Sequence, residues 1–84
     1  MMVKIQNDVI LTSLDKEIAL LNQKNGRYFC LNETGARIWE LLCETGDTQA
    51  TIDVILQEYS IDEGILKRDM DNLLAQLKLA ELLV

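Results

Sequence analysis

The chain of 84 residues contains no histidine and no proline, and only two cysteines and one tryptophan. Without histidine it lacks the usual general base and the commonest metal ligand, and two cysteines alone cannot complete a structural zinc site. A chain of this length buries only about 60% of the surface that its unfolded form exposes, so a deep pocket would compete with the core for apolar residues. The sequence therefore predicts one domain over residues 1–84 that binds a partner, is no enzyme and holds no metal or cofactor.

Charge and hydropathy exclude two further classes of partner. Eight Lys and Arg residues stand against 14 Asp and Glu residues, and the net charge of −6 repels nucleic-acid phosphates and anionic lipids. The longest apolar runs, 18–21 and 82–84, fall far short of the roughly 20 residues that span a bilayer. Residues 1–10 lack the pattern of a signal peptide. We expect a cytoplasmic protein, with no membrane or nucleic-acid partner and with reduced cysteines.

Three short apolar runs in the first third of the chain are each too short for a stable helix. They predict strands at about 9–12, 17–22 and 27–31. Asn25 and Gly26, between the second and third runs, supply the pair of positive-φ residues that tight hairpins favour. The pattern is typical of a three-stranded antiparallel meander.

After the third run the apolar period changes to that of a helix, which predicts helices at about 33–44, 49–59 and 63–79. Asn32 caps the first helix and Gly46 closes it, Asp47 or Thr48 caps the second, and Asp62 begins the third. A three-stranded sheet followed by three helices predicts an α+β fold of the winged helix-turn-helix type.

Aromatic and cysteine residues have ordinary structural interpretations. Trp39 lies within an apolar helical pattern and is expected to anchor the core. Tyr28 and Phe29 are neighbours on the third strand, so their side chains point to opposite faces of the sheet. Cys30 and Cys43 have no histidine as a partner base and are expected to be small reduced apolar residues and not nucleophiles.

The third strand forms one edge of the predicted meander, with unpaired backbone N–H and C=O groups along it. Residues 27–31 contain no proline and only one charge, which suits an edge that receives an extended peptide by strand addition. The competing interpretation is an edge covered by the N-terminal residues of the chain. The sequence leaves both open.

Asp69 is the one carboxylate that does not lie opposite the buried side of its helix. On a helical wheel it falls beside Leu66, Leu73 and Leu77, at the margin of the apolar stripe. There it could accept hydrogen bonds from a partner, or it could pair locally with Arg68 or Arg37.

The run N-G-R-Y-F-C-L-N-E-T-G-A-R-I-W-E-L-L at 25–42 resembles the signature stretch of PqqD-like proteins, the peptide-recognition elements of pathways that modify ribosomally made peptides. Later positions of the chain resemble the rest of that family pattern, namely Ile52, Leu56, Tyr59, Asp62, Asp69, Met70, Leu73 and Leu77. Among such proteins the chain is most similar to the standalone leader-binding proteins of lasso-peptide gene clusters.

The resemblance implies non-catalytic recognition of a precursor's leader peptide, which docks as an added strand along the third strand in a groove lined by the third helix. It also implies two further partners, a cysteine-protease-like leader peptidase and a macrolactam-forming cyclase. The binding residues that it implies are Arg27, Tyr28, Phe29, Cys30 and Leu31 on the strand, and Ile65, Asp69, Asn72, Leu73 and Gln76 on the helix.

Alternatives remain beside the lasso-peptide pathway. The family pattern also occurs in peptide chaperones of other modified-peptide pathways and of the quinone-cofactor pathway, and a protein-binding adaptor would suit the composition. A DNA-binding winged helix disagrees with the net charge of −6. The family commonly ends in a Gly-Leu pair, whereas this chain has Ala-Glu-Leu-Leu at 80–83, so its end either turns or continues the last helix.

Overall fold

The computed structural model describes residues 2–84, which form three strands followed by three helices. The elements are β1 (Val9–Leu14), β2 (Glu17–Asn22), β3 (Tyr28–Leu31), α1 (Glu33–Thr45), α2 (Thr48–Glu58) and α3 (Glu63–Leu79). This arrangement confirms the predicted α+β fold. The differences are small: β1 runs two residues beyond the predicted end, to Leu14, and β3 begins at Tyr28 instead of Arg27.

The sheet is an antiparallel meander in the order β1-β2-β3, with β2 in the centre. One row of side chains crosses all three strands, from Leu11 through Leu20 to Phe29. Leu20 is fully buried in this row, Phe29 is half-buried and Leu11 is exposed. The helices therefore cover the sheet on the side of β3 and leave β1 open.

Both hairpin turns use one residue with a positive φ. Gly26 has φ 71°, but Asn25 does not share this conformation, so the predicted pair of positive-φ residues is wrong. In the first turn Asp15 has φ 61°, which the sequence analysis did not predict. Aspartate tolerates this conformation better than most residues because its short polar side chain can bond locally to the backbone.

The three helices begin at side-chain caps, as their sequences predict. The side chains of Asn32, Asp47 and Asp62 each accept a hydrogen bond from the backbone N–H three residues later, at 2.8, 3.1 and 3.0 Å. Asp47, and not Thr48, is therefore the cap of α2. Gly46, with φ 65°, ends α1 and donates its N–H to the carbonyl of Leu42.

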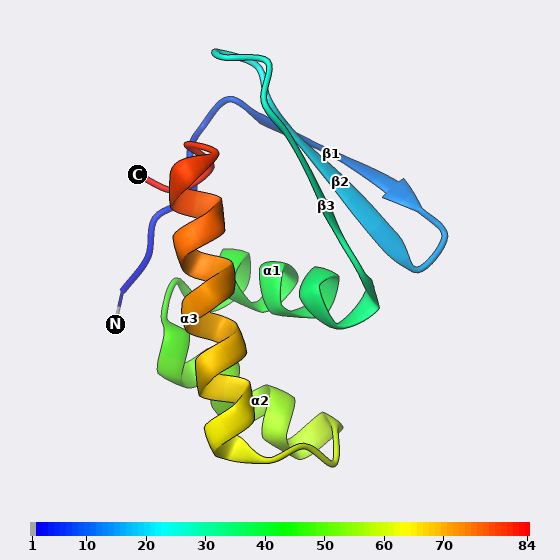
Figure 1. The fold of residues 1–84 in the computed structure, drawn as a ribbon, viewed down its shortest axis with the longest axis vertical. Helices are drawn as coiled ribbons and strands as arrows, with labels where there is room; N and C mark the ends of the chain where they lie inside the picture. Colours follow the sequence, from blue (N-terminus) through cyan, green and yellow to red (C-terminus); the bar gives the residue numbers. More distant parts are fainter. Residues whose placement is uncertain (1) are drawn as a thin grey trace.

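Helix α1 crosses under the sheet, α2 lies beyond α1, and α3 runs from α2 past α1 to the level of the sheet (Figure 1). The core forms where these layers meet, and its residues come from β2, β3, all three helices and the C-terminal segment. Trp39 on α1 is 3% exposed, which confirms that it anchors the core. No helix within residues 2–84 is long and apolar enough to cross a membrane.

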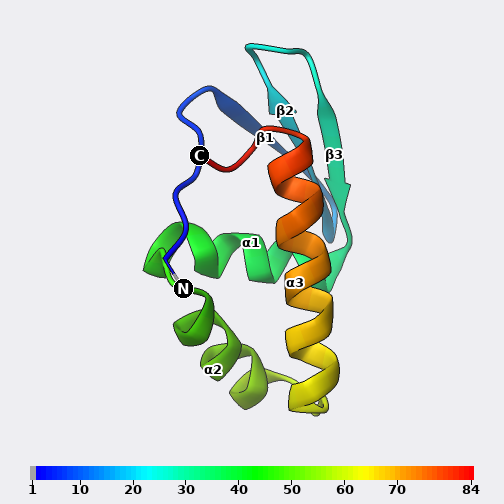
Figure 2. The same cartoon turned by 60° about the vertical axis from the view of Figure 1, so that its left-hand side comes forward.

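The chain turns after α3, so residues 80–83 do not continue the last helix. Ala80 ends the helix, and Glu81 has φ 58°, a left-handed conformation that normally favours glycine. The turn carries Leu82 into the core, where it is fully buried. The two ends of the chain then lie side by side, with Ile5 opposite Leu83 (Figure 2).

Candidate functional site: the groove between β3 and α3

One side of β3 is free to pair with another strand. The N–H of Asn22 donates to the carbonyl of Arg27 at 2.9 Å, so the backbone of Arg27 faces β2. Backbone groups of an antiparallel strand alternate in direction, and those of Tyr28 and Cys30 consequently point away from β2. Within residues 2–84 the sheet has no fourth strand beside them. The edge therefore offers two backbone donors and two acceptors.

The N-terminal residues do not cover this edge. Val3 donates its N–H to the carbonyl of Gly46 at 2.9 Å, and Ile5 lies opposite Leu83. The segment from residue 2 to the start of β1 thus runs beside the C-terminus and the end of α1. For these described residues the interpretation of an edge covered by the N-terminus is wrong.

The side chains of β3 divide between the two faces of the sheet. Tyr28, 68% exposed, and Cys30 lie on the outer face, whereas Phe29 packs against the core and Leu31 is buried. This alternation confirms that Tyr28 and Phe29 point to opposite faces. Because Leu31 is a core residue, its side chain cannot contact a bound peptide directly.

An open hollow of about 390 Å³ lies between β3 and α3, which run next to each other in Figure 2. It is lined by Arg27, Tyr28, Phe29, Gln76, Leu79 and Ala80. The structure therefore brings together four of the residues that the resemblance implies, Arg27, Tyr28 and Phe29 of the strand side and Gln76 of the helix. Leu79 and Ala80 were not predicted, although the 74% exposure of Leu79 marks it as an apolar side chain outside the core stripe.

Three hydrogen bonds tie the β2–β3 hairpin to the turn after α3 and close this end of the groove. Arg27 donates from Nη1 to the carbonyl of Leu79 at 2.6 Å, at the end of the helix where carbonyls lack helical partners. Asn22 donates from Nδ2 to the carbonyl of Glu81 at 2.7 Å, and Asn25 donates from Nδ2 to Oε2 of the same residue at 2.6 Å. These bonds fix the spacing of β3 and α3.

The other predicted residues of α3 extend the groove away from this closed end. Leu73 and Asp69 precede Gln76 by three and seven residues, which places them on the same side of the helix. Leu73 is half-buried against the core and Asp69 is exposed. Ile65, one further turn away, is 52% exposed, and Asn72 is exposed beside this row.

Asp69 makes no side-chain hydrogen bond or ion pair within residues 2–84. The predicted local partner Arg37 instead binds Glu58 and Glu40, with contacts of 2.6 Å to each. The Arg37 hydrogen bond lowers the pKa of the Glu58 carboxyl below its ordinary value. Both predicted local pairings of Asp69, with Arg37 and with Arg68, are therefore wrong for residues 2–84, and its side chain is exposed on the groove side of α3.

The surroundings of Cys43 do not favour a nucleophile. Cys30 and Cys43 are both free and exposed. Partial burial, and then the nearby Glu44 carboxylate, raise the pKa of the Cys43 thiol, which disfavours the nucleophilic thiolate. Residues 2–84 contain no cluster of side chains that could hold a metal ion.

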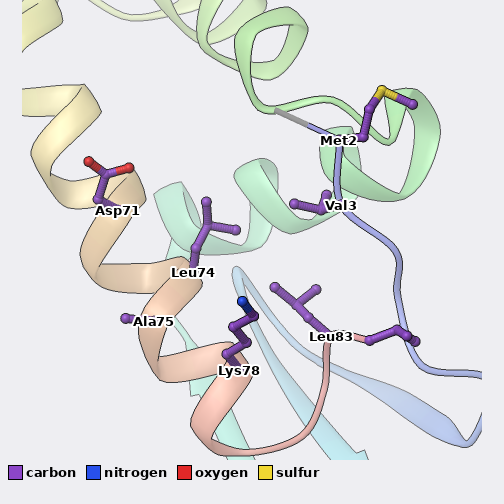
Figure 3. A pocket seen from close by; sticks show the side chains of 8 residues that line it. Met2, Val3, Asp71, Leu74, Ala75, Lys78 and Leu83 are labelled. Carbon is purple, nitrogen blue, oxygen red and sulfur yellow. The ribbon is translucent and has the colours of Figure 1, made fainter.

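A second hollow, of about 350 Å³, lies on the opposite flank of α3 (Figure 3). Asp71, Ala75 and Lys78 of the helix border it, facing the N-terminal and C-terminal segments around Val3 and Leu83. It contains none of the predicted site residues and no strand of the sheet. The open strand edge and the helix flank therefore meet at the β3–α3 groove and not here.

Known structures resemble the chain over nearly its whole length. One solved structure, TbiB1 in complex with the TbiA(beta) leader peptide, is 39% identical, with a TM-score of 0.88 over 95% of this chain and 93% of that one. A lasso peptide synthetase B1 complexed with the leader peptide shares the fold, with 21% identity and a TM-score of 0.86 over 100% and 99% of the two chains. No curated protein matches the chain significantly.

Family comparison agrees with these structures. The model of coenzyme PQQ synthesis protein D (PqqD) matches residues 17–83, from the start of β2 to the turn after α3. The match thus includes both walls of the groove and most of the sheet. Together with the 39% identical relative, it shows that this chain belongs to the PqqD family.

Proposed function

We propose that this protein recognises the leader peptide of a ribosomally made precursor and performs no chemistry on it. The observation that carries the proposal is the unpaired edge of β3 beside an open groove against α3. Further support comes from the 39% identical relative, whose solved complex contains a leader peptide.

The proposed mode of binding is strand addition. The backbone groups of Tyr28 and Cys30 would pair with the leader and supply affinity that depends little on its sequence. Side chains of the added strand alternate between the two faces of the sheet, and every second one would enter the groove beside Phe29, Gln76 and Leu79. Specificity would then come from the groove, and general affinity from the edge.

The groove residues divide into two roles in this proposal. Arg27, held by the Leu79 carbonyl, would end the groove, and Leu31 would support Phe29 from the core. The exposed row on α3 would contact leader side chains beyond the hollow. This row consists of Ile65, Asp69, Asn72, Leu73 and Gln76.

We further propose that the bound leader is delivered to a cysteine-protease-like leader peptidase and then to a macrolactam-forming cyclase of a lasso-peptide pathway. A module that holds the leader near an enzyme raises the local concentration of the attached core peptide without any catalytic group of its own. The step would take place in the cytoplasm, where the free cysteines Cys30 and Cys43 stay reduced.

Titration of the purified chain with a synthetic leader peptide, from the precursor encoded beside it, tests the recognition step. We expect saturable one-to-one binding in calorimetry and none for the core peptide of the same precursor. Equal binding of both peptides, or of neither, would contradict the proposal. A precursor peptide of a quinone-cofactor pathway is the second probe, since preference for it would favour that branch of the family.

Cleavage of the full precursor by the leader peptidase of the same gene cluster tests delivery separately. At a precursor concentration below its dissociation constant, addition of this chain should raise the cleavage rate. Leader binding without any change in this rate would keep recognition and refute delivery.

A further inference from the structure

A third hollow, of about 500 Å³, lies between the β1–β2 hairpin and α1. Its lining includes Leu11 and Ser13 of β1, Ile18 of β2, and Trp39 and Cys43 of α1, and we term it the β1–α1 hollow. It shares no residue with the groove between β3 and α3. A leader peptide bound in that groove therefore leaves the β1–α1 hollow open.

The edge of β1 beside this hollow is free to pair with an extended chain. Gln23 donates its N–H to the carbonyl of Asp8 at 2.8 Å, so the backbone of Asp8 faces β2. By alternation along β1, the N–H and C=O groups of Leu11 and Ser13 point away from β2. Within residues 2–84 no strand lies beyond β1, and its sequence, VILTSL, contains no charge or proline that would protect the edge. The two residues with free backbone groups are thus the same two that line the hollow from β1.

Apolar and acidic side chains meet in the β1–α1 hollow. Leu11 is 47% exposed and Ile18 is half-buried, so apolar surface is accessible there. Carboxylates line the hollow from both sides, Asp15 and Glu17 from the hairpin and Glu33 and Glu40 from α1. The hollow therefore suits a side chain that is apolar along its length and positively charged at its end.

Most of this negative charge has no partner in the chain. Arg37, which also lines the hollow, is held by Glu58 and Glu40, with contacts of 2.6 Å to each. The other three carboxylates, and the exposed cation Lys16, form no ion pair within residues 2–84. By contrast, the groove between β3 and α3 is lined by Arg27 and no carboxylate, and the hollow on the opposite flank of α3 by one aspartate and one lysine. Of the three hollows, the β1–α1 hollow is the acidic one.

We propose that the β1 edge and the β1–α1 hollow bind an extended basic segment of the leader peptidase, an inference that rests on the delivery proposed above. The segment would add to the sheet beside β1 and bond to the backbone of Leu11 and Ser13. Every second side chain of the segment would point toward the hollow. Lysine or arginine fits there, because its stem packs on apolar surface while its charge reaches the carboxylates.

Charge favours this occupant over a second copy of the chain. A second copy carries the same net charge of −6, and its own β1 contains no cation to offer to the carboxylates. Of the two enzymes in the proposed delivery, the peptidase is the one that acts on the leader, so it must approach the leader while the leader is bound.

The two edges of one sheet let the protein hold both partners at once. Neighbouring strands lie about 4.8 Å apart, so a leader added to β3 and a segment added to β1 lie four strand spacings, or about 20 Å, apart. This short separation would raise the concentration of the precursor near the enzyme. Docking at β1 thus supplies a physical route for delivery.

Binding of the purified leader peptidase of the same gene cluster to the full chain, without leader, is the first test. Glu33→Lys should weaken the complex by about tenfold or more at low salt, because it reverses a charge that faces the segment. Glu63→Lys is the matched control: it reverses the charge at the same position of α3, directly after the helix cap, and should leave the affinity unchanged. No binding by wild type, or equal affinities of the two variants, would overturn the proposal.

Removal of one backbone donor tests strand addition at β1. Ser13→Pro loses an outward N–H without losing a bond to β2, and proline is tolerated on edge strands. Affinity for the peptidase should fall by about tenfold, the equivalent of one lost hydrogen bond. Circular dichroism verifies the fold of the variant. Wild-type affinity of Ser13→Pro for the peptidase would refute pairing at β1.

Amide chemical shifts of the isotope-labelled chain, measured with unlabelled peptidase, locate the contact. The amides of Leu11, Ser13 and the part of α1 around Glu40 should shift, and those of Tyr28 and Cys30 should not. Shifts confined to β3 and α3 would place the enzyme in the groove and overturn the proposal. The expected shifts on concentrating the chain alone would assign the hollow to a second copy, which also overturns it.

Cleavage of the precursor separates this proposal from the function proposed above. Ser13→Pro should bind leader as tightly as wild type but raise the cleavage rate less, at peptidase concentrations below saturation. Full acceleration by Ser13→Pro would keep delivery and overturn docking at β1. Loss of leader binding by wild type, with peptidase docking intact, would count against leader recognition alone.

Discussion

The two edges of one small sheet differ in what lies beside them. β3 runs next to α3, and its inner residue Phe29 packs against the core. β1 instead borders a wider hollow of about 500 Å³, whose other wall includes Trp39 of α1, and Leu11, in the same cross-strand row as Phe29, is 47% exposed. Both edges have free backbone groups, but they face different helices: β3 faces α3 and β1 faces α1. Only β3 therefore lies beside the row of α3 residues that the sequence predicts to bind a peptide.

Three hydrogen bonds at the closed end of the groove explain why α3 stays beside β3. Arg27, Asn22 and Asn25 bond the β2–β3 hairpin to the turn after α3. The Asn22 side chain is buried and satisfied at both ends, since its Oδ1 accepts the N–H of Lys24 at 2.9 Å. No comparable bond holds the β1–β2 turn to a helix among the hydrogen bonds of residues 2–84.

The largest expected effect is on the free energy of unfolding, which truncation at β3 should lower more than truncation at β1. Phe29→Ala should lower the free energy of unfolding by about 3 kcal/mol, the lower end for phenylalanine truncation, because its ring is half-buried against the core. Leu11→Ala, in the same row at the other edge, should cost about 1 kcal/mol or less. Denaturant unfolding of both variants makes the comparison. Equal losses would mean that β1 is packed as firmly as β3.

The next effect is on leader affinity, which should fall when an outward backbone N–H is removed from β3 but not when one is removed from β1. Cys30→Pro removes an outward N–H of β3 without touching the bonds to β2, and proline is tolerated on edge strands. Leader affinity should fall by about tenfold or more, the equivalent of one lost hydrogen bond. Ser13→Pro removes the matching N–H of β1 and should keep leader affinity. Circular dichroism first verifies the fold of both variants, and calorimetry then measures their leader affinities. A larger loss of affinity in Ser13→Pro than in Cys30→Pro would contradict strand addition at β3.

A smaller effect concerns charge along the groove. Asp69 lies on the groove side of α3 and Asp71 borders the opposite hollow. If the leader carries Lys or Arg near the groove, Asp69→Lys should weaken binding several-fold at low salt and reduce its salt dependence. Asp71→Lys makes the same change in net charge away from the groove. Identical titration curves for the two variants would exclude a role for Asp69.

The smallest expected effect lies away from both edges, in the ion pairs between α1 and α2. Because Arg37 lowers the pKa of Glu58 in the folded chain, this carboxylate favours folding above its ordinary pKa of 4.5, and the contribution is lost as the pH falls through the folded-state pKa. Glu58→Gln should therefore flatten the fall in unfolding free energy on acidification. Parallel pH profiles for variant and wild type would show that the pair adds nothing to stability.

Local signals in the sequence predicted much of this fold. The caps Asn32, Asp47 and Asp62 act on N–H groups three residues away, so the residues that determine each helix start are neighbours in the sequence. The edge position of β3 followed from a meander of short strands. These features need no knowledge of tertiary contacts.

Long-range contacts account for what the sequence did not reveal. Glu81 adopts a conformation that favours glycine, and its carbonyl and side chain accept bonds from Asn22 and Asn25, more than fifty residues earlier. Leu79 and Ala80 line the groove only because this turn holds the end of α3 beside β3. Leu31 was predicted with its strand, but its alternation toward the core was not weighed.

Amide chemical shifts during a titration with the synthetic leader peptide test the central claim most directly. Binding at β3 should shift the amides of Tyr28 and Cys30 and of the groove side of α3 around Gln76, and leave those of Leu11 and Ser13 on β1 unchanged. Shifts concentrated on β1, with β3 unaffected, would contradict the account.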